Sequence, residues 1–224
     1  MKIRFLGHAA FELTHDGVTV LIDPFITGNP VATVKAEELS ADAILLTHGH
    51  EDHYGDTVAI AKRTGATVQA ITEIAGEIGE EGVETIDTNM GGTATYDWGS
   101  VRLTQAFHTS TTPKGTVTPP GGLVIEMGGK VIYHLGDTAL FSDLALPGQR
   151  KKVDIALIPI GGHYTMDRED AVVAAKLVGA DVVIPQHYDT FPPIATDAQA
   201  YKSEVEAAGY ARVEILEPGQ SYEA

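Results

Sequence analysis

The segment His48-Gly49-His50-Glu51-Asp52-His53 gathers three of the chain's nine histidines and two carboxylates within six residues. Imidazole and carboxylate groups are the side chains that bind zinc and related divalent ions. Side chains alternate along an extended chain, so His48 and His50 point to the same side and can share one ion. Asp52 and His53 follow where the chain is expected to turn into a helix, within reach of a second ion. The alternative is a solvated histidine-rich loop, but the density of ligand types favours a metal site.

The elements around this segment predict a strand–helix–strand unit. Ala43–Thr47 is continuously apolar, which is typical of a strand covered on both faces, and Asp56–Arg63 and Thr67–Ala70 favour a helix and another strand. A short helix is expected between Glu73 and Asp87. Further predicted strands are Lys2–Leu6, Ala10–Thr14, Val18–Ile22, Thr93–Tyr96, Val101–Phe107, Leu123–Met127, Lys130–His134, Ile155–Ile158, Val182–Ile184 and Val213–Leu216.

Two later helices have recognisable ends. Asp167 is expected to cap a helix over Arg168–Val178, which Gly179 closes. Thr196 and Gln199 fit a capping box for a helix that runs to Ala208.

The chain also contains a weak internal echo. Gly17–Asp23 followed by Asp42–Thr47 resembles Gly129–Asp137 followed by Asp154–Ile158, because in each pair a hairpin strand ends at an aspartate and a buried strand led by another aspartate comes next. The echo indicates two similar α/β halves that pack sheet on sheet, with helices outside.

The histidine segment resembles the His-x-His-x-Asp-His signature of the metallo-β-lactamase superfamily. Three later residues match the family's other ligand positions, in the same order. Each of these residues, His108, Asp137 and His187, follows a predicted strand. The resemblance implies that His48, His50 and His108 hold one metal ion, that Asp52, His53 and His187 hold the other, and that Asp137 bridges them. It further implies a four-layer αββα sandwich of two similar halves, formed by residues 1–224 as a single domain.

Shorter motifs resemble a subgroup of small, single-domain, uncharacterised metal-dependent hydrolases related to ascorbate-6-phosphate lactonase and N-acylphosphatidylethanolamine phospholipase D. These motifs are Gly7-His8-Ala9, Ile22-Asp23-Pro24, Tyr133–Thr138, Tyr164-Thr165-Met166 and His187–Pro193. The subgroup resemblance places His8 at the mouth of the metal site, as a contact to substrate or leaving group; a buried histidine bonded to backbone is the alternative.

The expected chemistry is hydrolysis. Two divalent ions, with zinc favoured and manganese, iron or nickel as alternatives, can bridge a water and make it a hydroxide near neutral pH. That hydroxide would cleave a small ester-like substrate, with a lactone or ester favoured and a phosphodiester as the alternative, and Asp52 is expected to orient it. The alternative from another functional class is a non-catalytic protein that binds a metal or another ligand. A missing metal ligand would indicate such a protein, but none of the seven ligand positions is missing.

Other residues receive supporting roles. His163 is our first choice for an acid that does not bind metal, and Asp23 is expected to orient the ligands from outside them. His134, in a predicted strand, is expected to pack there or to support the ligands, more often as a structural residue. Tyr188 and Phe191 are expected to line the substrate pocket.

Composition limits the partners. The 224 residues carry a formal net charge of −16, which opposes binding to nucleic acid or to an anionic membrane surface, so a small-molecule substrate is expected. The absence of cysteine excludes thiolate ligands and fits a reducing compartment. No signal peptide or membrane span is visible, so we expect a cytoplasmic protein. Homo-oligomerisation stays open.

Overall fold

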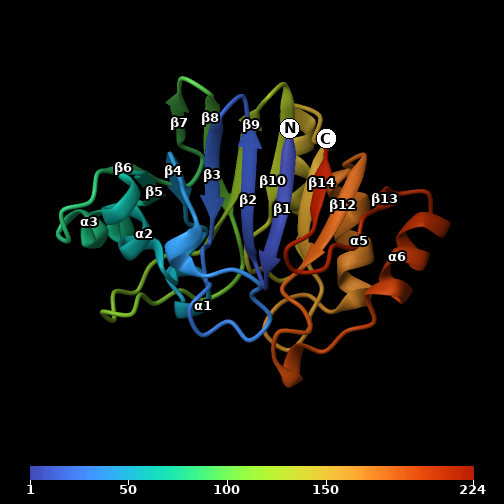
Figure 1. Ribbon diagram of the computed structural model, residues 1–224. Helices are drawn as coiled ribbons and strands as arrows, with labels where there is room; N and C mark the ends of the chain where they lie inside the picture. Colours follow the sequence, from blue (N-terminus) through green and yellow to red (C-terminus); the bar gives the residue numbers. More distant parts are fainter.

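Strands whose side chains are buried on both faces form the centre of the molecule. The structure, a computed structural model of residues 1–224, contains two seven-stranded sheets that pack face to face (Figure 1). All three residues of β4 (Ala43–Leu45) and all five of β11 (Ile155–Pro159) are buried, as their continuous apolar sequences predict. One hydrophobic core joins the two sheets, and a second core lies between the second sheet and its helices.

The two sheets share a strand order. The first runs β14 (Ser221–Glu223), β1 (Lys2–Gly7), β2 (Ala10–His15), β3 (Val18–Ile22), β4, β5 (Thr67–Ile71) and β6 (Thr85–Thr88). The second runs β7 (Thr93–Tyr96), β8 (Gly99–Gln105), β9 (Gly121–Met127), β10 (Lys130–His134), β11, β12 (Val182–Gln186) and β13 (Arg212–Val213). In both, antiparallel hairpin strands give way to parallel pairing, from β3 onward in the first sheet and from β10 onward in the second.

Helices cover the parallel part of each sheet. In Figure 1, α2 (Thr57–Thr64) and α3 (Thr72–Gly79) lie beside β4 to β6, and α5 (Arg168–Val178) and α6 (Ala198–Ala207) beside β11 to β13. The remaining helices are short: α1 (Glu51–Tyr54), α4 (Leu146–Arg150), and the 3-10 turns η1 (Ala36–Glu38), η2 (Ser142–Ala145) and η3 (Pro192–Ile194). The architecture is therefore the expected αββα sandwich. Even the longest helix, α5 with 11 residues, falls short of a span across a membrane.

The aspartate echo in the sequence corresponds to one repeated contact. Asp42 accepts a hydrogen bond from the backbone N–H of Thr19 at 2.8 Å, and Asp154 accepts one from Val131 at 2.7 Å. Each carboxylate ties the strand that it leads to the hairpin strand beside it, at matching places in the two sheets. The prediction of two similar halves is confirmed.

Helix ends show one correct and one wrong prediction. Asp167 caps α5 by accepting from the Asp170 N–H, and Gly179 closes it in the left-handed conformation. The Thr196/Gln199 capping box is wrong: Asp197 caps α6 through the Ala200 N–H, while the Thr196 hydroxyl donates to the Ile160 carbonyl. The last predicted strand is also too long, because only Arg212 and Val213 pair with β12.

Candidate metal centre

The predicted ligands converge at one edge of the sandwich, where strands from both sheets end. His48 follows β4, His108 follows β8, Asp137 follows β10 and His187 follows β12, although these residues lie far apart in sequence. In Figure 1 this edge is the lower one, next to α1. The carboxyl ends of strands are where α/β folds place their sites, because loops there are free to carry side chains.

The histidine segment follows the expected path. Beyond β4 the chain bends at Thr47 and again at His50, which precedes α1, and Asp52 and His53 lie in this single helical turn. The ligand atoms of His48, His50 and His108 all lie within 4.8 Å of one another. Those of Asp52, His53 and His187, joined by His8, form a second such group. The two sets contain the residues that the resemblance assigned to the two ions, and His48 and His53 also form a third such group with Asp23.

Gly49 is the point at which the histidine segment touches the loop after β8. A Cβ atom on Gly49 would lie 2.9 to 3.2 Å from side-chain and backbone atoms of Thr112. This loop cannot move away freely, because Ser110 accepts the Gly49 N–H at 3.0 Å and Thr112 donates to the buried Glu77 at 2.6 Å.

We therefore expect Gly49→Ala to destabilise the fold by about 1–3 kcal/mol through overpacking, and to weaken metal retention by displacing His48 and His50. Gly76→Ala is the matched control: Gly76 is helical with open space around it, so alanine there should be neutral or stabilising by about 0.5–1 kcal/mol. Urea unfolding and elemental analysis measure both effects. Equal stability and metal content in the two variants would contradict the prediction.

Asp137 lies between the two groups. Its carboxylate, 2% exposed, is 3.0 Å from His187 Nε2, 3.3 Å from His53 Nε2 and 3.5 Å from His108 Nε2. Three buried atoms at this point have no hydrogen-bond partner: His53 Nε2, Asp137 Oδ1 and His187 Nε2. Buried polar atoms are rarely left unpartnered, and a cation would satisfy those that converge here. The residues therefore fit a metal centre.

Hydrogen bonds to Nδ1 of His48 and of His53 leave the lone pair of each ring on Nε2, which faces the metal centre. The Thr47 hydroxyl donates to Asp23 at 2.6 Å, so its oxygen accepts from His48 Nδ1 at 3.0 Å, which leaves the lone pair of a neutral His48 on Nε2. Asp23 likewise accepts from His53 Nδ1 at 2.7 Å. Such carboxylate–imidazole contacts fix the tautomer of metal-binding histidines.

The electrostatics are those of a cation site. Burial lowers the pKa of His48, of His50 and of His108, so these imidazoles are neutral near pH 7 and carry the lone pair that a metal needs. Burial also acts to lower the pKa of His53, but the carboxylates of Asp137 and Asp23 outweigh it and raise that pKa well above the ordinary value. Two buried carboxylates thus favour positive charge at His53, which a proton or a metal cation can supply.

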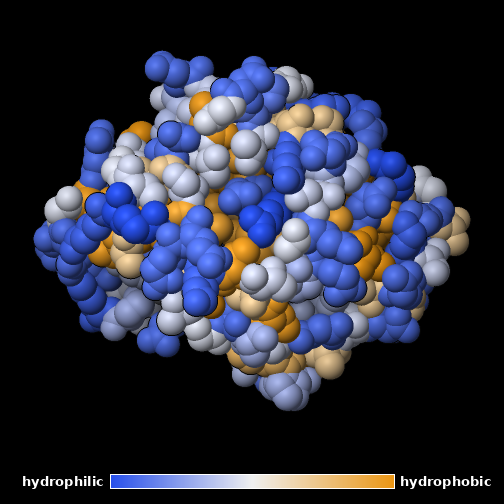
Figure 2. Space-filling model, viewed as in Figure 1, coloured by the Kyte–Doolittle hydropathy of each residue, from blue (hydrophilic) through white to orange (hydrophobic).

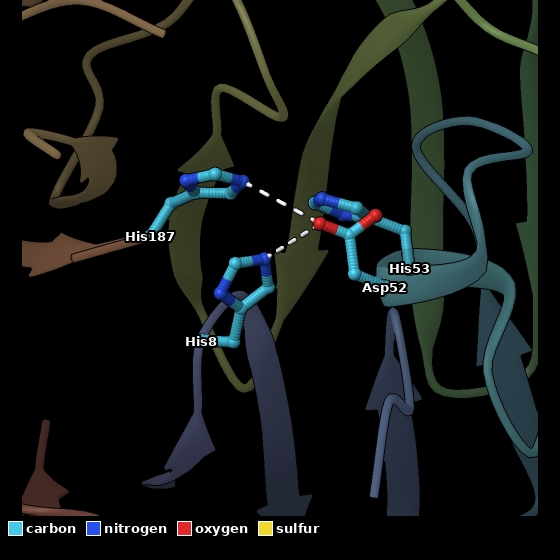
Figure 3. A group of neighbouring side chains, drawn as sticks. All are labelled: His8, Asp52, His53 and His187. Carbon is cyan, nitrogen blue, oxygen red and sulfur yellow. Dashed lines mark hydrogen bonds and ion pairs between the residues drawn. The ribbon is translucent and has the colours of Figure 1, made fainter. Parts of the chain in front are cut away.

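His8 joins the second group through Asp52. Its Nε2 is 3.0 Å from Asp52 Oδ2, and its Nδ1 is 2.9 Å from the Thr190 hydroxyl. Figure 3 shows His8 and His187 both directed at this carboxylate; His187 Nε2 is 3.9 Å from Oδ2. Burial lowers the pKa of His8 to about 4, so it is neutral near pH 7 and donates to Asp52.

Three residues of the cluster hold strained backbone. His8, Asp23 and His187 have φ values of 61°, 44° and 56°, in the left-handed region that non-glycine residues seldom adopt. Such conformations persist where the surroundings enforce them, and they concentrate at functional sites. In each case the unusual turn comes directly after a strand and directs the side chain into the cluster.

A mostly apolar cleft opens on the second group. It has a volume of about 390 Å³ and is lined by His8, Asp52 and His187 with Phe25, Glu51, Tyr164, Phe191, Pro193 and Ile194. No lysine or arginine lines it. Figure 2 shows apolar residues among hydrophilic ones in the lower part of the molecule, toward this edge.

The residues expected from the sequence to have supporting roles differ in whether they lie at the cleft. Phe191 lines the cleft, but Tyr188 lines a neighbouring hollow that His8 also lines. His163 is exposed, packs edge-on against Tyr164 and is absent from the cleft, so its assignment as an acid stays a prediction that these contacts do not support. His134 bonds only to backbone: it accepts from the Gly136 N–H and donates to the Ala9 carbonyl.

Sequence reasoning assigned no role to Thr47, Thr190, Phe25 or Tyr164, although Thr190 and Tyr164 lie in short motifs that resemble the hydrolase subgroup. Thr47 had one available signal, since it is the polar residue that ends a buried strand just before His48. The others depend on loops from distant parts of the chain.

The chain is similar to known proteins over its whole length. A family model described as a beta-lactamase superfamily domain matches residues 2–187. A UPF0173 metal-dependent hydrolase from Geobacillus thermodenitrificans is 48% identical over 232 residues, which covers 100% of both chains. A second, from Symbiobacterium thermophilum, is 48% identical over 225 residues and 99% of each chain.

Among solved structures, the metallo hydrolase Igni18 from the archaeon Ignicoccus hospitalis KIN4/I superposes with a TM-score of 0.91 at 41% identity, over 100% of this chain and 98% of that one. The likeness therefore spans both halves of the sandwich and is not confined to the histidine motif.

Proposed function

Because the chain belongs to the metallo-β-lactamase superfamily and is a metal-dependent hydrolase, we propose that it cleaves small, uncharged esters or lactones at a two-metal centre. The observation that carries the proposal is the pairing of two ligand groups around Asp137 with an apolar cleft that lacks basic side chains.

The ligand groups assign the residues to two ions. His48, His50 and His108 would hold one ion, Asp52, His53 and His187 the other, and Asp137 would contact both. Nitrogen and carboxylate donors suit zinc, and they also accept manganese, iron or nickel. Such ions polarise a substrate oxygen and acidify water near neutral pH.

The chain's own residues position the reaction. Asp23 and Thr47 hold the rings of His53 and His48 in fixed tautomers. Asp52, fixed by the hydrogen bond from His8, lines the cleft and would orient the attacking water and take its proton. Phe25 and Phe191 would hold the apolar part of the substrate and exclude bulk water.

Charge favours an uncharged ester over a phosphodiester. A phosphate group would meet no lysine or arginine in the cleft, and Glu51 adds an acid to its wall. Unmatched like charges cost affinity, so in a chain of net charge −16 an anionic substrate would depend on the metal ions alone.

The test compares initial rates of the metal-loaded protein on a small lactone panel, phenyl acetate, its anionic analogue 4-acetoxybenzoate, and bis(4-nitrophenyl) phosphate. We expect the neutral ester to exceed the anionic one by about tenfold or more in kcat/KM. Asp137→Ala serves as the inactive control. Preferred turnover of the phosphate diester would favour the phosphodiesterase alternative, and no turnover at full metal content would favour a non-catalytic role.

A further inference from the structure

A hollow larger than the cleft at the metal centre lies elsewhere on the molecule. It lies on the outer face of the second sheet, over β8, β9 and β10, where neither α5 nor α6 covers the strands. Residues of η2 and α4 wall it on one side and the Met90–Gly91 segment on the other. We call this hollow, of about 640 Å³, the outer groove. Its size is in the range of small-molecule sites.

The outer groove is basic in an acidic protein. Arg102, Arg150 and Lys151 line it, whereas the cleft at the metal centre and the hollow beside His8 are lined by no lysine or arginine. Of its two acids, Glu126 is paired with Lys151 at 2.7 Å. Arg102 and Arg150 form no ion pair, although the chain has 31 acidic residues for 15 basic ones.

Arg102 carries the strongest sign of a missing partner. It extends from β8 and is half-buried, and its Nε is buried without any hydrogen-bond acceptor. The buried Nε is out of a ligand's reach, but the terminal nitrogens are not buried and form no ion pair in the protein. A guanidinium in this state is shaped to bind a carboxylate or similar anion through two parallel bonds. Tyr133 and Thr104, from β10 and β8, add hydroxyl groups to the same hollow.

The rest of the lining is apolar. Met90, Val124, Phe141 and Leu146 contribute hydrocarbon surface, and Leu146 is 52% exposed. Because apolar side chains and unpaired arginines line the same hollow, the ligand that fits it has both an apolar part and a negative charge. A simple inorganic anion would leave this surface uncovered.

We propose that the outer groove is a second ligand site, which binds one small amphiphilic anion with its acidic head at Arg102 and Arg150 and its hydrocarbon body against Phe141 and Leu146. The equivalent face of the first sheet provides an internal comparison. There β1 takes the place of β8 in the strand order, and its outward Arg4 is already paired with Glu12 at 3.7 Å. That face therefore has no free guanidinium to offer.

The experiment is a calorimetric titration of the full-length protein with octanoate, and with octanamide as the uncharged analogue. Octanoate is expected to bind one molecule per chain and octanamide at least about tenfold more weakly. Arg102→Gln and Arg150→Gln should each weaken octanoate about tenfold, while the matched Arg4→Gln should leave its affinity unchanged. Melting curves of each variant verify that the fold is retained.

A carboxylate can also bind metal ions, so the titration is repeated on Asp137→Ala. Octanoate binding that survives this change, and is still weakened by Arg102→Gln, supports the outer groove. Binding lost in Asp137→Ala would place the anion at the metal centre and overturn the proposal. Equal affinity for octanamide, an equal loss in Arg4→Gln, or no saturation in the millimolar range would overturn it as well.

Discussion

Replacement of Asp137 by alanine is expected to lower the rate of ester hydrolysis more than about a hundredfold and to leave fewer than two metal ions per chain. The carboxylate lies 3.0 to 3.5 Å from imidazoles of both ligand sets, those of His187, His53 and His108. Without it, the lone pairs of three histidines would converge on two cations with one fewer negative charge between them. Initial rates and elemental analysis of dialysed protein measure the two effects.

The control for Asp137→Ala is Asp143→Ala, which removes an exposed carboxylate six positions further along the chain. It should keep both activity and metal. Treatment of the unmodified protein with a chelator should lower its rate to the level of Asp137→Ala, and added zinc should restore only the unmodified protein. Full metal content together with near-normal turnover in Asp137→Ala would refute the bridging role.

Replacement of Asp23 by alanine is expected to destabilise the fold by about 3–5 kcal/mol and to weaken metal binding about 10–100-fold. Asp23 is fully buried and accepts three hydrogen bonds, from the Thr47 N–H, the Thr47 hydroxyl and His53 Nδ1. Alanine leaves all three donors unsatisfied inside the protein, and it frees the rings of His48 and His53 to change tautomer.

Two measurements separate these effects of Asp23→Ala. Chemical unfolding reports stability, and competition with a chelator, at a temperature where the variant is folded, reports metal affinity. Asp154→Ala is the matched control, because Asp154 also bonds to backbone beside a buried strand but lies away from the metal centre. It should cost about 1 kcal/mol of stability with metal affinity unchanged. A loss of stability in Asp23→Ala with unchanged metal affinity would make Asp23 a structural residue only.

Local patterns in the sequence were sufficient for most of the architecture. Strand and helix periodicity, together with the two aspartate-led strands at Asp42 and Asp154, predicted two similar halves. The structure gives the reason for the repeated aspartate, which in each half accepts a hydrogen bond from the backbone of the neighbouring strand, at Thr19 and at Val131. The edge strands β6 and β14 were not predicted. Another error occurred where two local signals compete over neighbouring residues. At the start of α6, both Thr196 and Asp197 can cap a helix, and packing decides for Asp197 because the Thr196 hydroxyl bonds to the Ile160 carbonyl.

The sequence by itself determined the ligand set that we propose. The spacing within His48–His53 is a short-range property, and the resemblance to the metallo-β-lactamase signature implied His108, Asp137 and His187 as the other ligands. Each of these three follows a strand, whose end must lie at an edge of its sheet. That rule gives the edge on which a side chain lies. It does not give the direction in which the side chain points.

Only the tertiary structure decided the surroundings of the ligands. His8 and His163 both follow strands, yet His8 reaches Asp52 while His163 faces solvent and the cleft wall is formed by its neighbour Tyr164. Likewise, the sequence does not indicate that Arg102 on β8 lacks an ion-pair partner or that it shares a hollow with residues of η2 and α4. These outcomes depend on the turn taken after each strand and on contacts between segments far apart in the chain, and local periodicity carries no information about either.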